Sequence, residues 1–211
     1  MKSKDNKNFW GKLAARYDRI LSGSGKLYRD ILSNMKQTLN RNMTVLELAC
    51  GTGLLSVKIA PTVKHLEATD FSQEMIAQAK KKTHSAKLHF SVQDATKLPY
   101  APKTFDAVII SNALHIMPDP EAALDNIRRV LKDGGILIAP TFTAAGSFGG
   151  RMRIRIMELS GFKVFHKWTP ESYLAFLKEN GFVIRKSEVF GGSLTLTYAE
   201  AKKNNRSEEL L

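Results

Sequence analysis

The chain of 211 residues suits one domain, and its 43% hydrophobic and 25% charged residues are the composition of an ordinary globular protein. No apolar run reaches the roughly 18 residues that a membrane-spanning helix needs. The first ten residues are polar and lack the apolar core of a secretory signal, so we expect a cytoplasmic protein. The single cysteine, Cys50, excludes an internal disulfide and a metal site made of cysteines alone.

The net charge of +12 is concentrated near the N-terminus. Residues 1–42 hold ten Lys or Arg against three Asp, a net +7. Such a segment is typical of a solvated leader or of one that binds nucleic acid or an anionic membrane. Its later part has apolar residues at helical spacing, namely Leu27, Ile31, Met35 and Leu39. This basic amphipathic helix either packs on the core as a cap or lies on a membrane surface.

Beyond residue 42, strand and helix patterns alternate. The predicted strands are short and mainly apolar, at residues 44–49, 65–70, 87–94, 105–113, 136–142, 182–190 and 194–201. The predicted helices occupy residues 54–60, 72–82, 119–130 and 169–180. Ser72, Asp119 and Thr169 are placed to cap the last three helices. Gly134-Gly135 is expected to end the helix that begins near Asp119.

This alternation predicts an α/β protein with a mostly parallel sheet of seven strands and helices on both faces. The last two strands have a short connection and are therefore expected to be antiparallel. We divide the chain into a basic helical cap (1–42), a main domain (43–200) with an insert (141–168), and a polar tail (201–211). Ligands of such sheets bind at the carboxyl ends of the strands.

Residues 45–56, VLELACGTGLLS, place a glycine loop directly after the first predicted strand. Glycines there let the backbone approach a ligand and present amide groups to it. A dinucleotide fingerprint would continue to a third glycine, where this chain has Ser56. Glu47, beside the loop, would repel a pyrophosphate, so a ligand with an ammonium group fits better.

Two further strand ends carry acids. Asp70 follows Gly53 by seventeen residues and can accept hydrogen bonds from both hydroxyls of a ribose. Asp94 ends the third strand and can accept from an adenine amino group. Three neighbouring strand ends therefore suit a nucleoside that carries a positively charged amino-acid end.

Five segments resemble, in order and spacing, the motifs of class I S-adenosylmethionine-dependent methyltransferases: VLELACGTG, ATDFSQEMI, QDATKLPY, FDAVIISNALHIMPDP and LKDGGILI. They span roughly residues 45–140. With the leader FWGKLAARYD, the chain most resembles the ubiquinone and menaquinone C-methyltransferases and their small-molecule relatives. The resemblance implies a Rossmann-like fold, S-adenosyl-L-methionine as cofactor, and direct in-line transfer of a methyl group to a small organic or lipid-like acceptor.

The resemblance also implies a set of cofactor-binding residues. The methionine part would contact Glu47, Ala49, Gly51 and Gly53, and the ribose would contact Asp70. The adenine would contact Phe71, Met75, Asp94 and Ala95, and the sulfonium would lie near Asn112 and Tyr17. Leu54 stands where some relatives have an acid, which leaves the acceptor open.

Two residues are candidates for catalysis. Alignment of the acceptor with an electrophilic sulfonium can supply about 7–11 kcal/mol without a protein nucleophile. His115 is the candidate general base and Asn112 the candidate for contact with the reacting groups. The alternative for His115 is a loop histidine bonded to the backbone. No metal site is expected.

The predicted insert would select the acceptor. Its Phe, Met and Trp residues offer an apolar lining, and Arg151, Arg153 and Arg155 either meet an anionic acceptor group or face water. A small-molecule or lipid-like partner is expected, without specific nucleic acid. One alternative is a phospholipid or quinone methyltransferase that contacts an anionic membrane through the N-terminal helix. Another is a non-catalytic module that binds an adenosyl ligand.

Overall fold

The computed structural model describes residues 9–11, 13–14, 18, 25–83, 85–143, 155, 158, 162–191 and 195–204. The strands are β1 (Thr44–Leu48), β2 (His65–Asp70), β3 (Leu88–Val92), β4 (Phe105–Ile110), β5 (Leu131–Ile138), β6 (Thr141–Thr143), β7 (Phe182–Phe190) and β8 (Thr195–Lys203). The helices include α3 (Gly25–Thr38), α4 (Ser56–Ile59), α5 (Gln73–Lys80), α6 (Pro120–Val130) and α8 (Pro170–Glu179), with short 3-10 turns η3 (Ala60–Thr62) and η4 (Leu114–Ile116). Tyr17, Arg151, Arg153 and most of the predicted insert lie outside the described residues.

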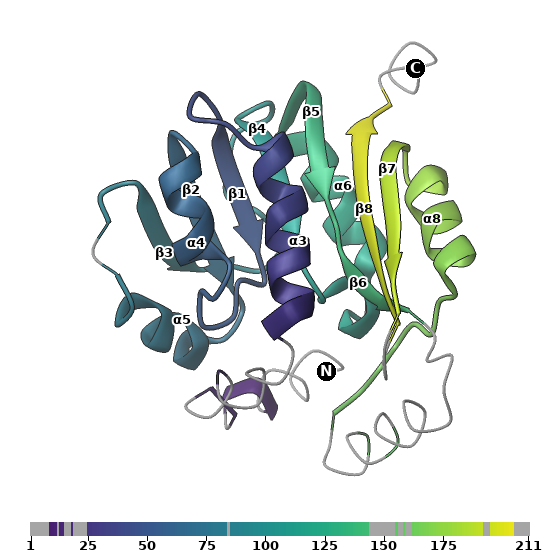
Figure 1. Ribbon diagram of the computed structural model, residues 1–211, viewed down its shortest axis with the longest axis horizontal. Helices are drawn as coiled ribbons and strands as arrows, with labels where there is room; N and C mark the ends of the chain where they lie inside the picture. The colour runs from purple at the N-terminus through teal and green to yellow at the C-terminus, as the bar shows by residue number, and fades with distance from the viewer. Residues whose placement is uncertain are drawn as a thin grey trace.

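The strands form one mixed sheet, with helices in front of it and behind it (Figure 1). Strands β3, β2, β1, β4 and β5 are parallel neighbours in that order. β8 then pairs antiparallel with β5, and β7 pairs antiparallel with β8. The predicted α/β class, the parallel sheet and the antiparallel C-terminal pair are confirmed.

The described sheet has eight strands where seven were predicted. The predicted strand at 136–142 is interrupted at Pro140, which has no N–H to donate to a ladder. Its two parts, β5 and β6, pair with successive stretches of β8. β8 also continues past the predicted domain end at residue 200, because Ala201 still pairs with Leu137.

The predicted caps are present, but one predicted helix end is wrong. The side chains of Ser72 and Asp119 accept hydrogen bonds from backbone amides in the first turns of α5 and α6. Thr169 forms a reciprocal capping box with Ser172 at the start of α8. Gly134-Gly135 does not end α6, which stops at Val130. The glycine pair lies within β5, where the register with β4 shifts.

Each face of the sheet has its own apolar core. One core joins β1, β4 and β5 to α6 and α8, with Leu124, Ile127 and Tyr173 fully buried. The other joins the sheet to α3 and α4, with Ile31 and Met35 fully buried. The apolar stripe of α3 therefore faces the sheet and is not open to a membrane surface. None of the helices among the described residues is long and apolar enough to cross a membrane.

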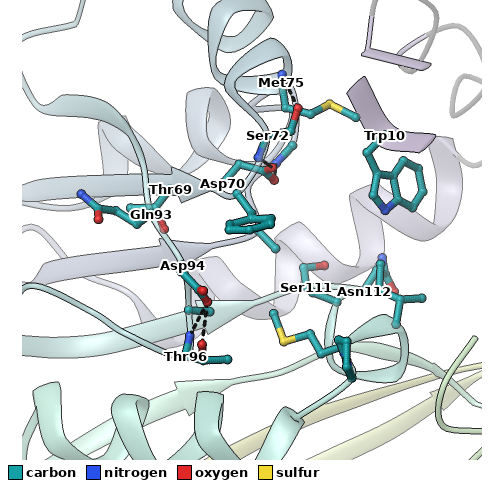
Figure 2. A pocket seen from close by; sticks show the side chains of 18 of the residues that line it. Trp10, Thr69, Asp70, Ser72, Met75, Gln93, Asp94, Thr96, Ser111 and Asn112 are labelled. Carbon is teal, nitrogen blue, oxygen red and sulfur yellow. Dashed lines mark hydrogen bonds between the residues drawn. The ribbon is translucent and has the colours of Figure 1, made fainter. Parts of the chain in front are cut away.

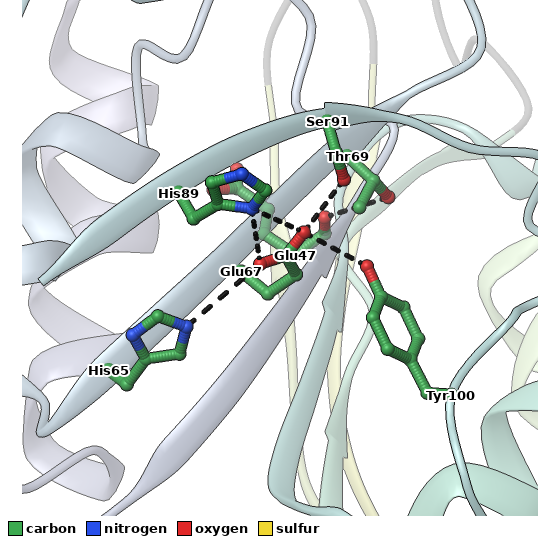
Figure 3. A network of polar contacts seen from close by, with 7 residues as sticks. All are labelled: Glu47, His65, Glu67, Thr69, His89, Ser91 and Tyr100. Carbon is green, nitrogen blue, oxygen red and sulfur yellow. Dashed lines mark hydrogen bonds and ion pairs between the residues drawn. The ribbon is translucent and has the colours of Figure 1, made fainter.

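A polar cluster on β2 and β3 holds the connection between β3 and β4 (Figure 3). The Glu67 carboxylate accepts hydrogen bonds from the Ser91 hydroxyl at 2.7 Å and from the Tyr100 hydroxyl at 3.0 Å. Its Oε2 also lies 2.8 Å from Nδ1 of His89. Because the Glu67 side chain is only 12% exposed, this carboxylate needs these partners. The cluster thus fixes the segment that carries Asp94 at its start.

Candidate functional site

A cavity of about 480 Å³ opens at the carboxyl ends of β1, β2, β3 and β4 (Figure 2). A volume in this range is typical of sites for small molecules and cofactors. The cavity lies where the fold class places ligands. Its wall consists of Trp10, Ala49, Gly51, Thr69, Asp70, Phe71, Ser72, Met75, Gln93, Asp94, Ala95, Thr96, Lys97, Ser111, Asn112, Ala113, Ile116, Met117, Pro118 and Asp119.

The glycine loop after β1 brings bare backbone to this cavity. Gly51 and Gly53 have φ of 56° and 75°, in the left-handed region that glycine adopts without a steric penalty. A Cβ on Gly53 would lie 2.9 Å from the Phe90 ring, so this position excludes a side chain for two independent reasons. Ala49 shares the left-handed conformation and lies in the cavity wall.

Asp70, at the end of β2, is held by two backbone amides. Its Oδ2 accepts from the Gly51 N–H and its Oδ1 from the Ser72 N–H, each at 2.8 Å. Burial raises the pKa of this carboxyl, while the backbone N–H groups of Ser72, Gly51 and Phe71 oppose the rise. Each carboxylate oxygen keeps a second lone pair. Asp70 can therefore accept hydrogen bonds from hydroxyl groups of a ligand while it stays hydrogen-bonded to the glycine loop.

The next wall is apolar with a polar edge. Phe71 is 38% exposed although it is a large aromatic residue, and it lines the cavity beside Met75. Asp94 caps its own turn, since Oδ1 accepts from both the N–H and the hydroxyl of Thr96. This combination suits a flat heteroaromatic ring between apolar side chains, with amino hydrogens at the edge facing Asp94.

Asn112 and Ser111 close the cavity after β4. Asn112 has a φ of 55°, and its N–H donates to the Pro140 carbonyl at 2.8 Å. Within the described part of the chain, its side-chain Oδ1 and Nδ2 are buried and have no hydrogen-bond partner, and the same holds for Oγ of Ser111. Buried polar groups without partners are costly. These atoms therefore fit a ligand that supplies the missing partners.

Of the predicted cofactor-binding residues, those in the cavity wall are Ala49, Gly51, Asp70, Phe71, Met75, Asp94, Ala95 and Asn112. Glu47 and Gly53 are not part of the wall, and Tyr17 lies outside the described residues. Burial raises the pKa of Glu47 to about 7, the charge of Asp70 adds to the rise, and the Ser56 hydroxyl opposes it. An ammonium contact of Glu47 stays a prediction.

His115 does not line the cavity, although its neighbours Ile116 and Met117 do. Its Nδ1 lies 2.9 Å from the Thr141 hydroxyl, and its carbonyl accepts from the N–H groups of Phe165 and His166. Burial, with a smaller contribution from His166, lowers the pKa of His115 to about 4, so the ring is neutral at pH 7. The catalytic role of His115 stays a prediction that this geometry does not support.

Sequence reasoning missed several wall residues, of which Trp10, Ser111 and Met117 matter most. Trp10 comes from the N-terminal segment, where its ring packs edge-on against Phe162 with centroids 5.5 Å apart. The only signal in the sequence was the aromatic pair before Tyr17. Ser111 could have been found beside Asn112, because both follow directly on β4.

Residues 46–139 match the family of methyltransferase domains. This stretch of the chain, which holds the glycine loop and the cavity-lining strand ends, is therefore similar to methyltransferase domains. A demethylmenaquinone methyltransferase of Clavibacter sepedonicus is 37% identical over 137 residues, which are 63% of this chain and 56% of that protein. A ubiquinone/menaquinone biosynthesis C-methyltransferase of Rickettsia bellii is 32% identical over 136 residues, 60% of this chain and 54% of that protein. The chain thus spans a little over half the length of these curated relatives.

Solved methyltransferase structures share the fold. A putative methyltransferase of Haloferax volcanii, in complex with the Trm112 activator, has a TM-score of 0.78 at 17% identity and covers 92% of this chain and 95% of its own. A possible histamine N-methyltransferase from Thermotoga maritima has a TM-score of 0.73 at 21% identity and covers 93% and 99%. The predicted resemblance to S-adenosylmethionine-dependent methyltransferases is confirmed, and these solved structures show the fold.

Proposed function

We propose that this chain transfers a methyl group from S-adenosylmethionine to a ring carbon of a small quinone-like aromatic acceptor. The observation that carries the proposal is the group of unpartnered polar atoms of Ser111 and Asn112 in a cavity whose other walls suit an adenosyl group. The names of the curated relatives support the acceptor class. When bound, the cofactor supplies a methyl group on an electrophilic, positively charged sulfur.

The residues of the chain would bind and orient. Asp70 would accept the ribose hydroxyls, and Phe71 with Met75 would hold the adenine ring. Asn112 and Ser111 would satisfy polar groups of the methionine part or of the acceptor. Trp10 and Met117 would keep water from the reacting groups, and the alignment favours direct in-line transfer. We expect the acceptor to react as a hydroquinone that has lost a hydroxyl proton to water, because His115 does not line the cavity. The ring carbon that gains the methyl group gives up its own hydrogen to water as a proton.

The test measures release of S-adenosylhomocysteine with a water-soluble, short-chain hydroquinone as acceptor. Asn112→Ala should lower the rate at least tenfold, because it removes both orphaned amide atoms. Asn40→Ala is the matched control, since the Asn40 side chain accepts a hydrogen bond from the Asn42 N–H in an exposed turn. Equal rates for the two variants would refute the role of Asn112.

A second acceptor class is separated in the same assay. Vesicles with anionic lipid and a long-chain hydroquinone replace the soluble acceptor in a parallel reaction. Release only with vesicles would support a membrane-embedded acceptor, reached through the polar face of α3 and not through its buried apolar stripe. Tight binding of S-adenosylhomocysteine without release in either reaction would favour the non-catalytic binding module.

A further inference from the structure

Asp18 forms a three-way polar cluster with two distant parts of the chain. Its Oδ1 accepts a hydrogen bond from the Thr52 hydroxyl at 2.5 Å, and its Oδ2 lies 2.5 Å from the ammonium of Lys82. Lys82 Nζ also donates to the Thr52 hydroxyl at 3.0 Å. The cluster therefore joins the N-terminal segment to the glycine loop and to the turn that follows α5.

Thr52 connects this cluster to the cofactor cavity. It is 1% exposed and stands between Gly51 and Gly53, the two loop glycines with positive φ. The Gly51 N–H donates to Asp70 in the cavity wall. Glycine is conformationally permissive and has no side chain. Thr52 is therefore the residue between the two glycines whose side chain can hold the loop in place. A partner that holds this hydroxyl also holds the orientation of the Gly51 amide.

The N-terminal segment has a second attachment near Trp10. Phe9 and Trp10 both pack against the buried ring of Phe162, with centroids 5.4 and 5.5 Å away. Gly11 lies against α5, since a Cβ there would be 3.1 Å from Oε2 of Glu74. Trp10 is itself part of the cavity wall. One attachment of this segment is thus aromatic and faces the cavity, and the other is polar and holds the glycine loop.

We infer that Asp18 is a positioning residue that fixes the glycine loop and the N-terminal segment relative to each other, so that Trp10 stays in the wall of the cofactor cavity. The inference rests on the cofactor site of the proposed function. It does not depend on the acceptor. The two described side chains that the Asp18 carboxylate contacts, Thr52 and Lys82, are not in the cavity wall, so Asp18 acts through Thr52.

The cluster lies close enough to solvent to respond to salt. The side chains of Asp18 and Lys82 are 44% and 25% exposed. Exposed charge pairs are screened, and their contribution is modest. We therefore expect loss of Asp18 to weaken binding of an adenosyl ligand about fivefold, the lower end of the usual range for coupled sites. Raising the salt concentration should weaken binding by wild type more than by the variant.

The first experiment is calorimetric titration of the full chain with S-adenosylhomocysteine, which needs no acceptor. Asp18→Ala should raise Kd about fivefold and Asp18→Asn by less, because the amide can still accept from Thr52. Asp133→Ala is the matched control: it also removes an acid from an ion pair, with Lys103 on the exposed surface, and should leave Kd unchanged. Thr52→Val should reproduce the loss, and adding Asp18→Ala to it should cost little more.

The second experiment follows the position of Trp10 directly. The chain has two tryptophans, so Trp168→Phe leaves Trp10 as the reporter. Its fluorescence should change on addition of S-adenosylhomocysteine, and the change should be lost with Asp18→Ala. No binding by wild type would reject the proposed cofactor site. Wild-type affinity and fluorescence response in Asp18→Ala would reject the role of Asp18 alone, while leaving the proposed function standing.

Discussion

The two sides of the cavity are built in different ways. The wall from β1 to β3 is held by hydrogen bonds from backbone amides to Asp70. Its glycine loop contains two glycines with positive φ. The opposite wall includes Trp10, whose ring packs on Phe162, and Ile116 and Met117. These two follow His115, whose carbonyl accepts from the N–H groups of Phe165 and His166. We call the first wall the rigid frame. The second wall is made of packed side chains, which can be exchanged to suit a different acceptor.

The largest expected effect tests the rigid frame. Gly53→Ala should lower the free energy of unfolding by about 2–4 kcal/mol, because it combines the cost of positive φ with a Cβ 2.9 Å from the Phe90 ring. Gly134→Ala is the matched control: its φ is also positive, at 72°, but the space around it is open, so only about 1–2 kcal/mol is expected. Urea unfolding measures both, and equal losses would contradict the packing argument.

The second prediction uses two buried titratable groups that do not line the cavity, Glu47 in β1 and His115 after β4. The His115 pKa of about 4 lies below its ordinary 6.5, so its contribution to stability is complete above pH 6.5 and is lost as the pH falls toward 4. The Glu47 pKa of about 7 lies above its ordinary 4.5, so its contribution is complete below pH 4.5 and is lost as the pH rises toward 7.

The two contributions should therefore oppose each other between pH 4.5 and 6.5, each reaching up to about 3 kcal/mol. Relative to wild type, Glu47→Gln should make stability rise more steeply with pH in this window, and His115→Gln should make it rise less or fall. Unfolding free energies measured from pH 4.5 to 7.5 give the slopes. Parallel profiles for all three proteins would show that neither group is buried as described.

The smallest expected effect compares two helix caps. Ser72→Ala and Thr169→Ala should each cost about 1 kcal/mol of stability, because each removes an oxygen that accepts from the first turn of a helix. Only Ser72→Ala should also weaken binding of S-adenosylhomocysteine, since the lost cap loosens the turn whose backbone N–H, at residue 72, donates to Asp70. Calorimetry separates the two variants, and equal affinity in both would place the cap of α5 outside the rigid frame.

The same difference explains what sequence reasoning could predict. The glycine loop, Asp70 and Asp94 follow from local backbone geometry and from spacing along single strand ends. The direction of His115, the wall position of Trp10 and the orphaned atoms of Ser111 depend on contacts between distant segments, which no local pattern contains. The split at Pro140 had a visible signal, because proline lacks an N–H. The register shift at Gly134-Gly135 could not be told from a helix end in the sequence, since glycine occurs both after helices and at irregularities within strands.

The docking of α3 has a consequence for the order in which the chain folds. Asn34 and Thr38 donate hydrogen bonds to Glu188 and Glu200, which lie 154 and 162 residues further along the chain. During synthesis, α3 leaves the ribosome long before β7 and β8 exist, so its apolar stripe has no complete surface to cover. We therefore expect α3 to dock fully only after the last strands have been made, and its apolar stripe to be open to aggregation until then.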